Sequence, residues 1–190
     1  MKKKCESRRW AWVLTGSGHF FNESIRLINR LDNIDLFVSK AAEEVLVMYK
    51  KNGEIPKDIK IYKDNTASSV PVGQFYRGIY HTVIMAPTSS NTVAKCVIGI
   101  SDNLATNVFA QSGKCRVPCI FFPCDTAPEL KTRSPKGMVE VFPRKIDLEN
   151  VERLKSFENI KVVMNFYELE KEIMNREKCQ KKYVRNWKTC

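Results

Sequence analysis

Short apolar runs alternate with amphipathic segments along this chain. The run from Trp10 to Leu14 ends in Thr-Gly-Ser-Gly, which is typical of a buried parallel strand that enters a tight turn. In residues 20–31 apolar side chains recur at every third or fourth position, with Arg26 and Arg30 elsewhere, which predicts a helix packed on a sheet. The chain therefore begins with a predicted strand, loop and helix.

The same alternation continues toward the C-terminus. Strands are predicted at residues 35–38, 59–62, 82–86, 117–122 and 160–163, and the segment 59–62 alternates like an edge strand. Further helices are predicted between and after these strands. Ser39 and Asp147 would each cap one, another follows the strand that ends at Pro87, and two more run from 103 to 110 and from Phe166 onward. This order predicts an α/β fold in which a doubly wound parallel sheet lies between two layers of helices.

A length of 190 residues with 43% hydrophobic content suits a single domain over 1–190. Residues 123–146 are rich in Pro, Thr, Lys and Gly, and they predict an irregular arm or lid outside the core. Residues 166–190 predict a basic C-terminal helix and tail. No apolar stretch approaches the roughly 20 residues of a membrane helix, so we expect a soluble, cytoplasmic protein without a membrane partner.

Seven cysteines are scattered along the chain, at positions 5, 96, 115, 119, 124, 179 and 190. An odd number without a secretory signal argues against a disulfide framework, so most should be free thiols. The grouping Cys115-x3-Cys119-x4-Cys124 lacks the close C-x2-C pairs of zinc sites and of most iron–sulfur sites. We therefore predict no metal site.

The formal net charge of +11 favours acidic partners, which could be nucleic acid, an anionic cofactor or an acidic protein. Part of the charge lies near the two ends, at Lys2–Lys4 and between Lys178 and Lys188, where solvated tails are the simplest interpretation. No aromatic-rich binding motif accompanies these residues. Nucleic acid is therefore the disfavoured partner.

Three polar loops should meet at the carboxyl ends of the predicted strands, where ligands bind in doubly wound sheets. The first loop, Thr15-Gly16-Ser17-Gly18-His19, combines glycines, hydroxyl groups and a following helix N-terminus, as a phosphate site requires. A tight turn with a good cap is the alternative interpretation. Ser39 and the run Thr88-Ser89-Ser90-Asn91-Thr92 open later helices, and capping explains only one or two of them.

These loops together resemble a known protein family. The residues that carry the resemblance are Leu14-Thr15-Gly16-Ser17-Gly18, Ser39-Lys40-Ala41-Ala42, Ala86-Pro87 through Lys95, and Gly99-Ile100-Ser101-Asp102-Asn103-Leu104. Together they are similar to the superfamily of homo-oligomeric flavin-containing Cys decarboxylases, over roughly Trp10 to Val163. The run Pro143 to Val151 resembles its archaeoflavoprotein and dihydromethanopterin reductase (acceptor) branch.

The resemblance implies a flavodoxin-like, Rossmann-like fold that binds FMN between subunits of a trimer, with trimers associating into dodecamers or larger shells. It implies that the phosphate and ribityl chain contact the Thr-Gly-Ser-Gly and Ser-Lys loops, with the Ser89–Thr92 loop near phosphate and flavin. The implied FMN-binding residues are Thr15, Gly16, Ser17, Gly18, His19, Ser39, Lys40, Pro87, Thr88, Ser89, Ser90, Asn91, Thr92, Lys95, Asp102 and Asn103.

The chain departs from the decarboxylases of this superfamily in one loop. They carry a Pro-x-Met-Asn-x-x-Met clamp, whereas the corresponding loop here, Pro123 to Glu129, has neither Met nor Asn at the clamp positions. His19 and His81 are the two histidines; His81 is expected to be structural, and His19 either contacts phosphate or serves as a cap or surface residue. No nucleophile–base pair is visible, so the catalytic residues stay unknown.

The sequence therefore predicts an FMN-dependent oxidoreductase whose cofactor carries the chemistry. The positive charge favours an acidic electron donor such as ferredoxin, which the resemblance also implies, and a pterin such as dihydromethanopterin is the candidate acceptor. A decarboxylase or prenyltransferase of the same superfamily is the alternative.

Overall fold

The computed structural model describes residues 8–51, 53–65 and 69–186. Its centre is a parallel sheet of six strands: β1 (Arg9–Leu14), β2 (Ile34–Val38), β3 (Lys60–Lys63), β4 (Tyr80–Thr88), β5 (Cys119–Pro123) and β8 (Ile160–Val162). The spatial order is β3-β2-β1-β4-β5-β8, with each neighbouring pair parallel. The order reverses between β1 and β4, which makes the sheet doubly wound.

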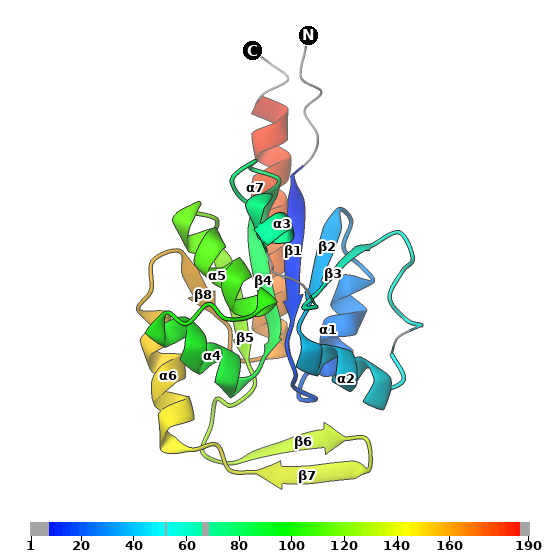
Figure 1. The fold of residues 1–190 in the computed structure, drawn as a ribbon, viewed down its shortest axis with the longest axis vertical. Coiled ribbons are helices and arrows are strands. Elements are labelled where there is room, and N and C mark those ends of the chain that lie inside the picture. Colours follow the sequence, from blue (N-terminus) through cyan, green and yellow to red (C-terminus); the bar gives the residue numbers. More distant parts are fainter. Residues whose placement is uncertain (1–7, 52, 66–68, 187–190) are drawn as a thin grey trace.

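Helices cover both faces of this sheet (Figure 1). Apolar side chains of α1 (Phe21–Ile28), α2 (Lys40–Met48) and α7 (Phe166–Asn186) share a core with Trp10, Trp12 and Leu14 of β1. On the other face, α4 (Ser90–Ile98), α5 (Leu104–Lys114) and α6 (Lys145–Lys155) pack over Ala11 and Val13. The short helix α3 (Ser69–Gly73) contacts α5. Alternate residues of β1 thus point into two hydrophobic cores, one on each face of the sheet. The predicted three-layer, flavodoxin-like α/β fold is confirmed.

Two element ends differ from the sequence prediction. Strand β4 does not stop at Pro87: it continues through a cis Ala86–Pro87 bond to Thr88. The pairing with β5 shifts register between Met85 and Thr88, so the missing N–H of proline falls at an irregular position of the ladder. Asp147 is not the cap of α6, because Arg144 occupies that position and Asp147, three residues on, accepts its backbone N–H at 3.0 Å.

The predicted irregular arm contains regular structure. Strands β6 (Leu130–Ser134) and β7 (Gly137–Val141) form an antiparallel hairpin in which Leu130 pairs with Val141. Its turn ends in Gly137 at φ 135°, a conformation open to glycine. Figure 1 shows the hairpin lying beyond the carboxyl ends of the central strands, apart from the sheet. Neither hydrophobic core includes residues 130–141. The expectation that 123–146 is an irregular segment outside the core is wrong, because Pro123 ends β5, Cys124 is buried and Lys145 begins α6.

The predictions of free cysteines and of no membrane helix can be compared with the described residues. Cys96, Cys115, Cys119, Cys124 and Cys179 are free thiols, whereas Cys5 and Cys190 lie outside the described residues, as does the Lys2–Lys4 run. None of the described helices combines the length and apolar character needed to cross a membrane. The cytoplasmic location, the single-domain organisation and the basic tail stay predictions.

Candidate functional site

The site begins at the point where the strand order reverses. Strands β1 and β4 lie side by side there, and Thr15, which follows β1, is almost completely buried between their ends. Its Oγ1 donates a hydrogen bond to the Pro87 carbonyl at 2.8 Å and accepts one from the Ser89 backbone N–H at 2.8 Å. One hydroxyl therefore joins the β1–α1 loop to the β4–α4 loop.

Two glycines let the β1–α1 loop lie close to α2 and its end. A Cβ on Gly16 would come within 2.3 Å of the Ala41 Cβ, and one on Gly18 within 2.2 Å of the Tyr49 hydroxyl. Both distances are far below van der Waals contact. The loop therefore requires glycine at position 16, where it meets the Cβ and backbone of Ala41, whereas a Cβ at position 18 would have to displace the end of the Tyr49 side chain. Both approaches are close, as the phosphate-loop interpretation expects.

Helix α1 begins directly behind this loop and has no side-chain cap. Its N-cap residue, Phe20, has φ 61° in the left-handed region, and its ring stacks on Phe122 with centroids 4.2 Å apart. By contrast, Ser39 and Ser89 cap α2 and α4 by accepting the Ala42 and Thr92 N–H groups. The first turn of α1 therefore offers backbone donors and the positive end of a helix dipole to an anion.

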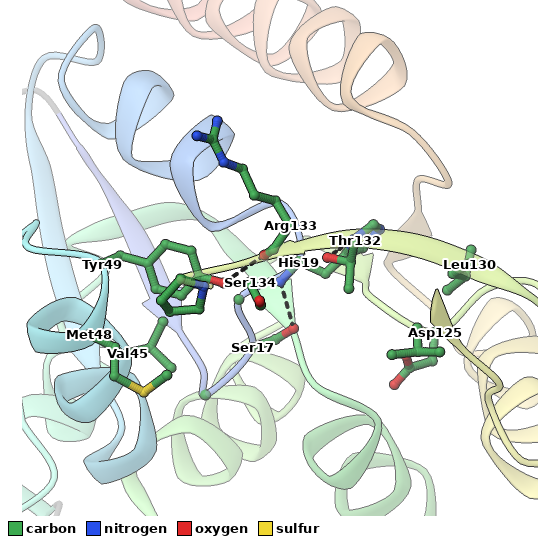
Figure 2. A pocket seen from close by; sticks show the side chains of 14 residues that line it. Ser17, His19, Val45, Met48, Tyr49, Asp125, Leu130, Thr132, Arg133 and Ser134 are labelled. Carbon is green, nitrogen blue, oxygen red and sulfur yellow. Dashed lines mark hydrogen bonds between the residues drawn. The ribbon is translucent and has the colours of Figure 1, made fainter. Parts of the chain in front are cut away.

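A pocket of about 350 Å³ lies between this loop, α2 and the hairpin. Figure 2 shows Val45, Met48 and Tyr49 on one side and Asp125 and Leu130 on the opposite side. The pocket thus has a polar floor and several apolar side chains in its walls. Its full lining is Gly16, Ser17, Gly18, His19, Val45, Met48, Tyr49, Asp125, Leu130, Thr132, Arg133, Ser134, Pro135 and Val141.

Two hydrogen bonds hold the hairpin over the pocket. The Nδ1 of His19 lies 2.7 Å from the Thr132 Oγ1, and the Tyr49 hydroxyl donates to the Arg133 carbonyl at 2.7 Å. His19 belongs to the loop after β1, and Tyr49 lies at the end of α2. Both the loop and α2 are therefore hydrogen-bonded to β6. These bonds make β6 part of the site.

Burial sets the protonation of the groups near the pocket. It lowers the pKa of His19, an effect that outweighs the opposite influence of Asp125 and Glu23, so the imidazole is neutral at pH 7. Burial also raises the pKa of the Cys124 thiol to about 12, which leaves it protonated and a poor nucleophile. The polar groups near this pocket can therefore bind and orient a ligand, whereas Cys124 is not an activated nucleophile.

Comparison with known proteins identifies the family. The model of the family named Flavoprotein matches residues 1–186. The chain belongs to the Flavoprotein family.

Three relatives place this flavoprotein more finely. The crystal structure of Burkholderia xenovorans DmrB in complex with FMN, described as a cubic protein cage for redox transfer, is 48% identical with a TM-score of 0.83, covering 91% of this chain and 97% of that one. An uncharacterised protein of Methanocaldococcus jannaschii is 31% identical, over 90% of this chain and 97% of its own. The dihydromethanopterin reductase (acceptor) of Methanosarcina mazei is 36% identical, over 62% of this chain and 55% of its own.

These findings confirm the resemblance to flavoproteins and to the dihydromethanopterin reductase (acceptor) branch. The flavoprotein spans about half the length of the Methanosarcina reductase.

The structure brings only part of the predicted FMN-binding set together. Gly16, Ser17, Gly18 and His19 line the pocket. Others adjoin it through contacts: Thr15 joins Pro87 and Ser89, Ser90 donates to the pocket carboxylate Asp125, Ser39 caps the helix that carries Val45 and Met48, and Thr92 bonds Ser89. The Thr88 hydroxyl is turned back to the Met85 carbonyl.

The remaining predicted residues lie outside this pocket. Lys40 and Asn91 are exposed, Lys95 forms an ion pair with Asp102 at 2.7 Å, and Asn103 caps α5. Their role in binding stays a prediction, as it does for the residues in the pocket.

Sequence reasoning missed the pocket walls formed by α2 and the hairpin. Tyr49, Thr132 and Arg133 carry no motif. Tyr49 ends α2, whereas Thr132 and Arg133 belong to a hairpin that was expected to be irregular. The available signal was the turn-forming sequence Ser134-Pro135-Lys136-Gly137.

Proposed function

We propose that this flavoprotein binds FMN at the carboxyl edge of its sheet and acts as an FMN-dependent oxidoreductase. The observation that carries the proposal is the Thr15–His19 loop, in which Gly16 has no room for a side chain and which leads into a helix without a side-chain cap. The 48% identity to DmrB, which was solved with FMN, supports the same ligand.

The residues present fit the parts of FMN. The backbone of Gly16 to Gly18, the Ser17 hydroxyl and the N-terminus of α1 suit a phosphate. Val45, Met48, Leu130 and Val141 offer apolar surface to a flat ring system, and the polar groups of Ser39, Ser90 and Asp125 lie on neighbouring loops. We assign phosphate to the loop and the flavin ring to the apolar walls.

The predicted ligands outside the pocket have a place in this proposal. Lys40, Asn91, Lys95, Asp102 and Asn103 would contact flavin bound chiefly by another copy in a homo-oligomer, as the resemblance to trimeric and dodecameric proteins implies. The cage described for DmrB supports assembly of this kind. Pro87 and Thr88 would shape the pocket from the end of β4, where the Pro87 carbonyl accepts a hydrogen bond from Thr15.

The bound flavin would supply electron transfer between a donor and an acceptor. The protein would hold the cofactor, keep His19 neutral and cover the pocket with the hairpin. The net charge of +11 supports an acidic donor such as ferredoxin. The name of the Methanosarcina relative supports dihydromethanopterin or a similar pterin as acceptor.

The absorption spectrum of the purified protein, before and after incubation with FMN, tests cofactor binding. Gly16→Ala should abolish FMN uptake, because its Cβ would meet the Ala41 Cβ. Gly113→Ala, a helical position with open space around it, is the matched control and should bind FMN normally. A colourless protein that takes up no FMN, or equal binding by both variants, would contradict the assignment.

Electron flow is tested separately. The FMN-loaded protein should be reduced by reduced ferredoxin faster than by NADH, and should then be reoxidised by dihydromethanopterin. Faster reduction by NADH would contradict the donor. Decarboxylation of a cysteinyl substrate with the flavin retained would favour the alternative function in the same superfamily.

A further inference from the structure

A second pocket, of about 410 Å³, lies at the opposite edge of the sheet. It is built where β1 and β4 begin and where α5 ends. No aspartate or glutamate belongs to its lining, which consists of Arg8, Phe75, Tyr76, Gly78, Tyr80, His81, Lys114, Cys115, Arg116, Val117 and Pro118. The proposed flavin site does not use any of these residues.

Three cationic side chains converge on this pocket. Arg8, Lys114 and Arg116 are exposed, and within the described part of the chain none of them forms an ion pair with a carboxylate. Arg116 adopts φ 53°, a left-handed conformation that favours glycine or asparagine just after a helix. An arginine therefore occupies a backbone position at which glycine or asparagine would be less strained.

The C-terminal dipole of α5 accounts for cations at Lys114 and Arg116, but not for the rest of the pocket. Arg8 comes from the start of β1, and His81 from the start of β4 is only 8% exposed. Burial together with the nearby Arg8 and Arg176 lowers the pKa of His81 to about 4. His81 is therefore neutral at pH 7, and the positive charge comes from Arg8 before β1 and from Lys114 and Arg116 at the end of α5, which is the field expected at an anion site.

The pocket also offers aromatic surface. Phe75 and Tyr80 are buried in the adjoining core, whereas Tyr76 lines the same pocket and is 70% exposed. An exposed tyrosine ring next to cations can stack on a flat heterocycle while the cations bind its phosphate. The volume is larger than a single phosphate needs, and it lies within the range of small-molecule sites.

We propose that this pocket binds a small phosphate monoester with a flat heterocyclic ring, such as a nucleoside monophosphate. The phosphate contacts Arg8, Lys114 and Arg116, and the ring lies against Tyr76. Because β1 has six residues, the sheet separates this site from the carboxyl edge by about 20 Å. The two ligands can therefore bind at the same time.

The test is isothermal titration calorimetry on the full chain saturated with FMN, with AMP, adenosine and inorganic phosphate as probes. We expect one AMP per chain, with adenosine and inorganic phosphate each at least tenfold weaker. Equal affinity for AMP and inorganic phosphate would overturn ring recognition. Absence of AMP binding, or release of FMN by AMP, would overturn the separate site.

Variants locate the binding. Arg116→Asn removes the charge but keeps a residue suited to the left-handed conformation, and Lys114→Gln keeps the side-chain length. Each should weaken AMP at least tenfold without changing FMN content. Arg153→Ala removes an exposed cation on α6 and should leave AMP affinity unchanged. Unchanged affinity in both pocket variants, or an equal loss in the control, would overturn the proposal.

Discussion

The Nδ1 of His19 lies 2.7 Å from the Oγ1 of Thr132, although 113 positions separate the two residues in the sequence. His19 ends the glycine-containing loop after β1, and Thr132 is the middle residue of β6. With the bond from Tyr49 to the Arg133 carbonyl, this contact fixes the hairpin against the predicted phosphate loop. Retention of a ligand in the pocket should therefore depend on the His19–Thr132 hydrogen bond, although neither residue belongs to the central sheet.

Replacing Thr132 with valine should loosen the hairpin without changing the shape of its side chain. Loss of one hydrogen bond costs about 1 kcal/mol, so FMN should dissociate roughly fivefold faster. Stopped-flow release of FMN, together with limited proteolysis between Leu130 and Val141, would measure the effect. Thr132→Ser keeps the hydroxyl and should behave as the parent does. Release at the parent rate in Thr132→Val would show that the bond does not hold the hairpin.

Thr15→Val should destabilise the junction of β1 and β4. The substitution leaves the buried Pro87 carbonyl and the partly buried Ser89 N–H without their partner, and an unsatisfied buried group costs about 1–3 kcal/mol. The free energy of unfolding from urea denaturation should fall by that amount and FMN affinity should fall with it. Thr15→Ser retains both bonds and is the control. A loss of FMN affinity without a loss of stability would instead assign Thr15 a direct contact with the ligand.

Asp35 should be essential to the opposite end of β1. The residue is 2% exposed, and its carboxylate pairs with Arg9 at 2.7 Å and accepts a hydrogen bond from the Tyr80 hydroxyl at 2.7 Å. Asp35→Ala leaves the buried Tyr80 hydroxyl without its acceptor and the partly exposed Arg9 without its partner, and it should lower the free energy of unfolding by about 2–3 kcal/mol. Tyr80→Phe removes a single hydrogen bond and should cost about 1 kcal/mol. Thermal denaturation that ranks the two variants equally would contradict this network.

The parts of the molecule set by local chemistry were predictable from sequence. The run Trp10–Leu14, the Ser39 cap and the Ser89–Ser90 helix start depend on hydrophobic period and on side chains that bond nearby N–H groups. The glycines at 16 and 18 signal close approach, but the atoms they approach, on Ala41 and Tyr49, follow only from the packed fold. Contacts between distant segments have no local signature.

Pro87 and the hairpin show where local rules fail for a physical reason. Proline normally ends a strand, yet β4 continues because the ladder is irregular at that point. The hairpin is mostly exposed, so it lacks the hydrophobic alternation by which buried strands are recognised. Consequently the loop half of the candidate site was predictable, whereas the half formed by α2 and β6 was not.

Mild acid should destabilise the protein through His81. Its folded pKa of about 4 lies below the ordinary value near 6.5, so above pH 6.5 both the folded and unfolded states are neutral there and the full stability is present. As the pH falls below 6.5 the unfolded state binds the proton first, and between pH 7 and pH 5 the loss amounts to about 2 kcal/mol. His19, whose pKa is also lowered, adds a loss of the same sign.

The variant His81→Phe isolates this contribution. It keeps an aromatic ring against Trp10, whose centroid lies 4.4 Å from that of His81, but it cannot bind a proton. Losing the bond to Thr82 shifts stability equally at all pH values, so only the slope reports on titration. Urea midpoints at pH 7 and pH 5 should differ less in His81→Phe than in the parent, and less than in His19→Gln, which still carries His81. An unchanged slope in His81→Phe would mean that the His81 imidazole has the same pKa in the folded and the unfolded protein, which would contradict the lowered value.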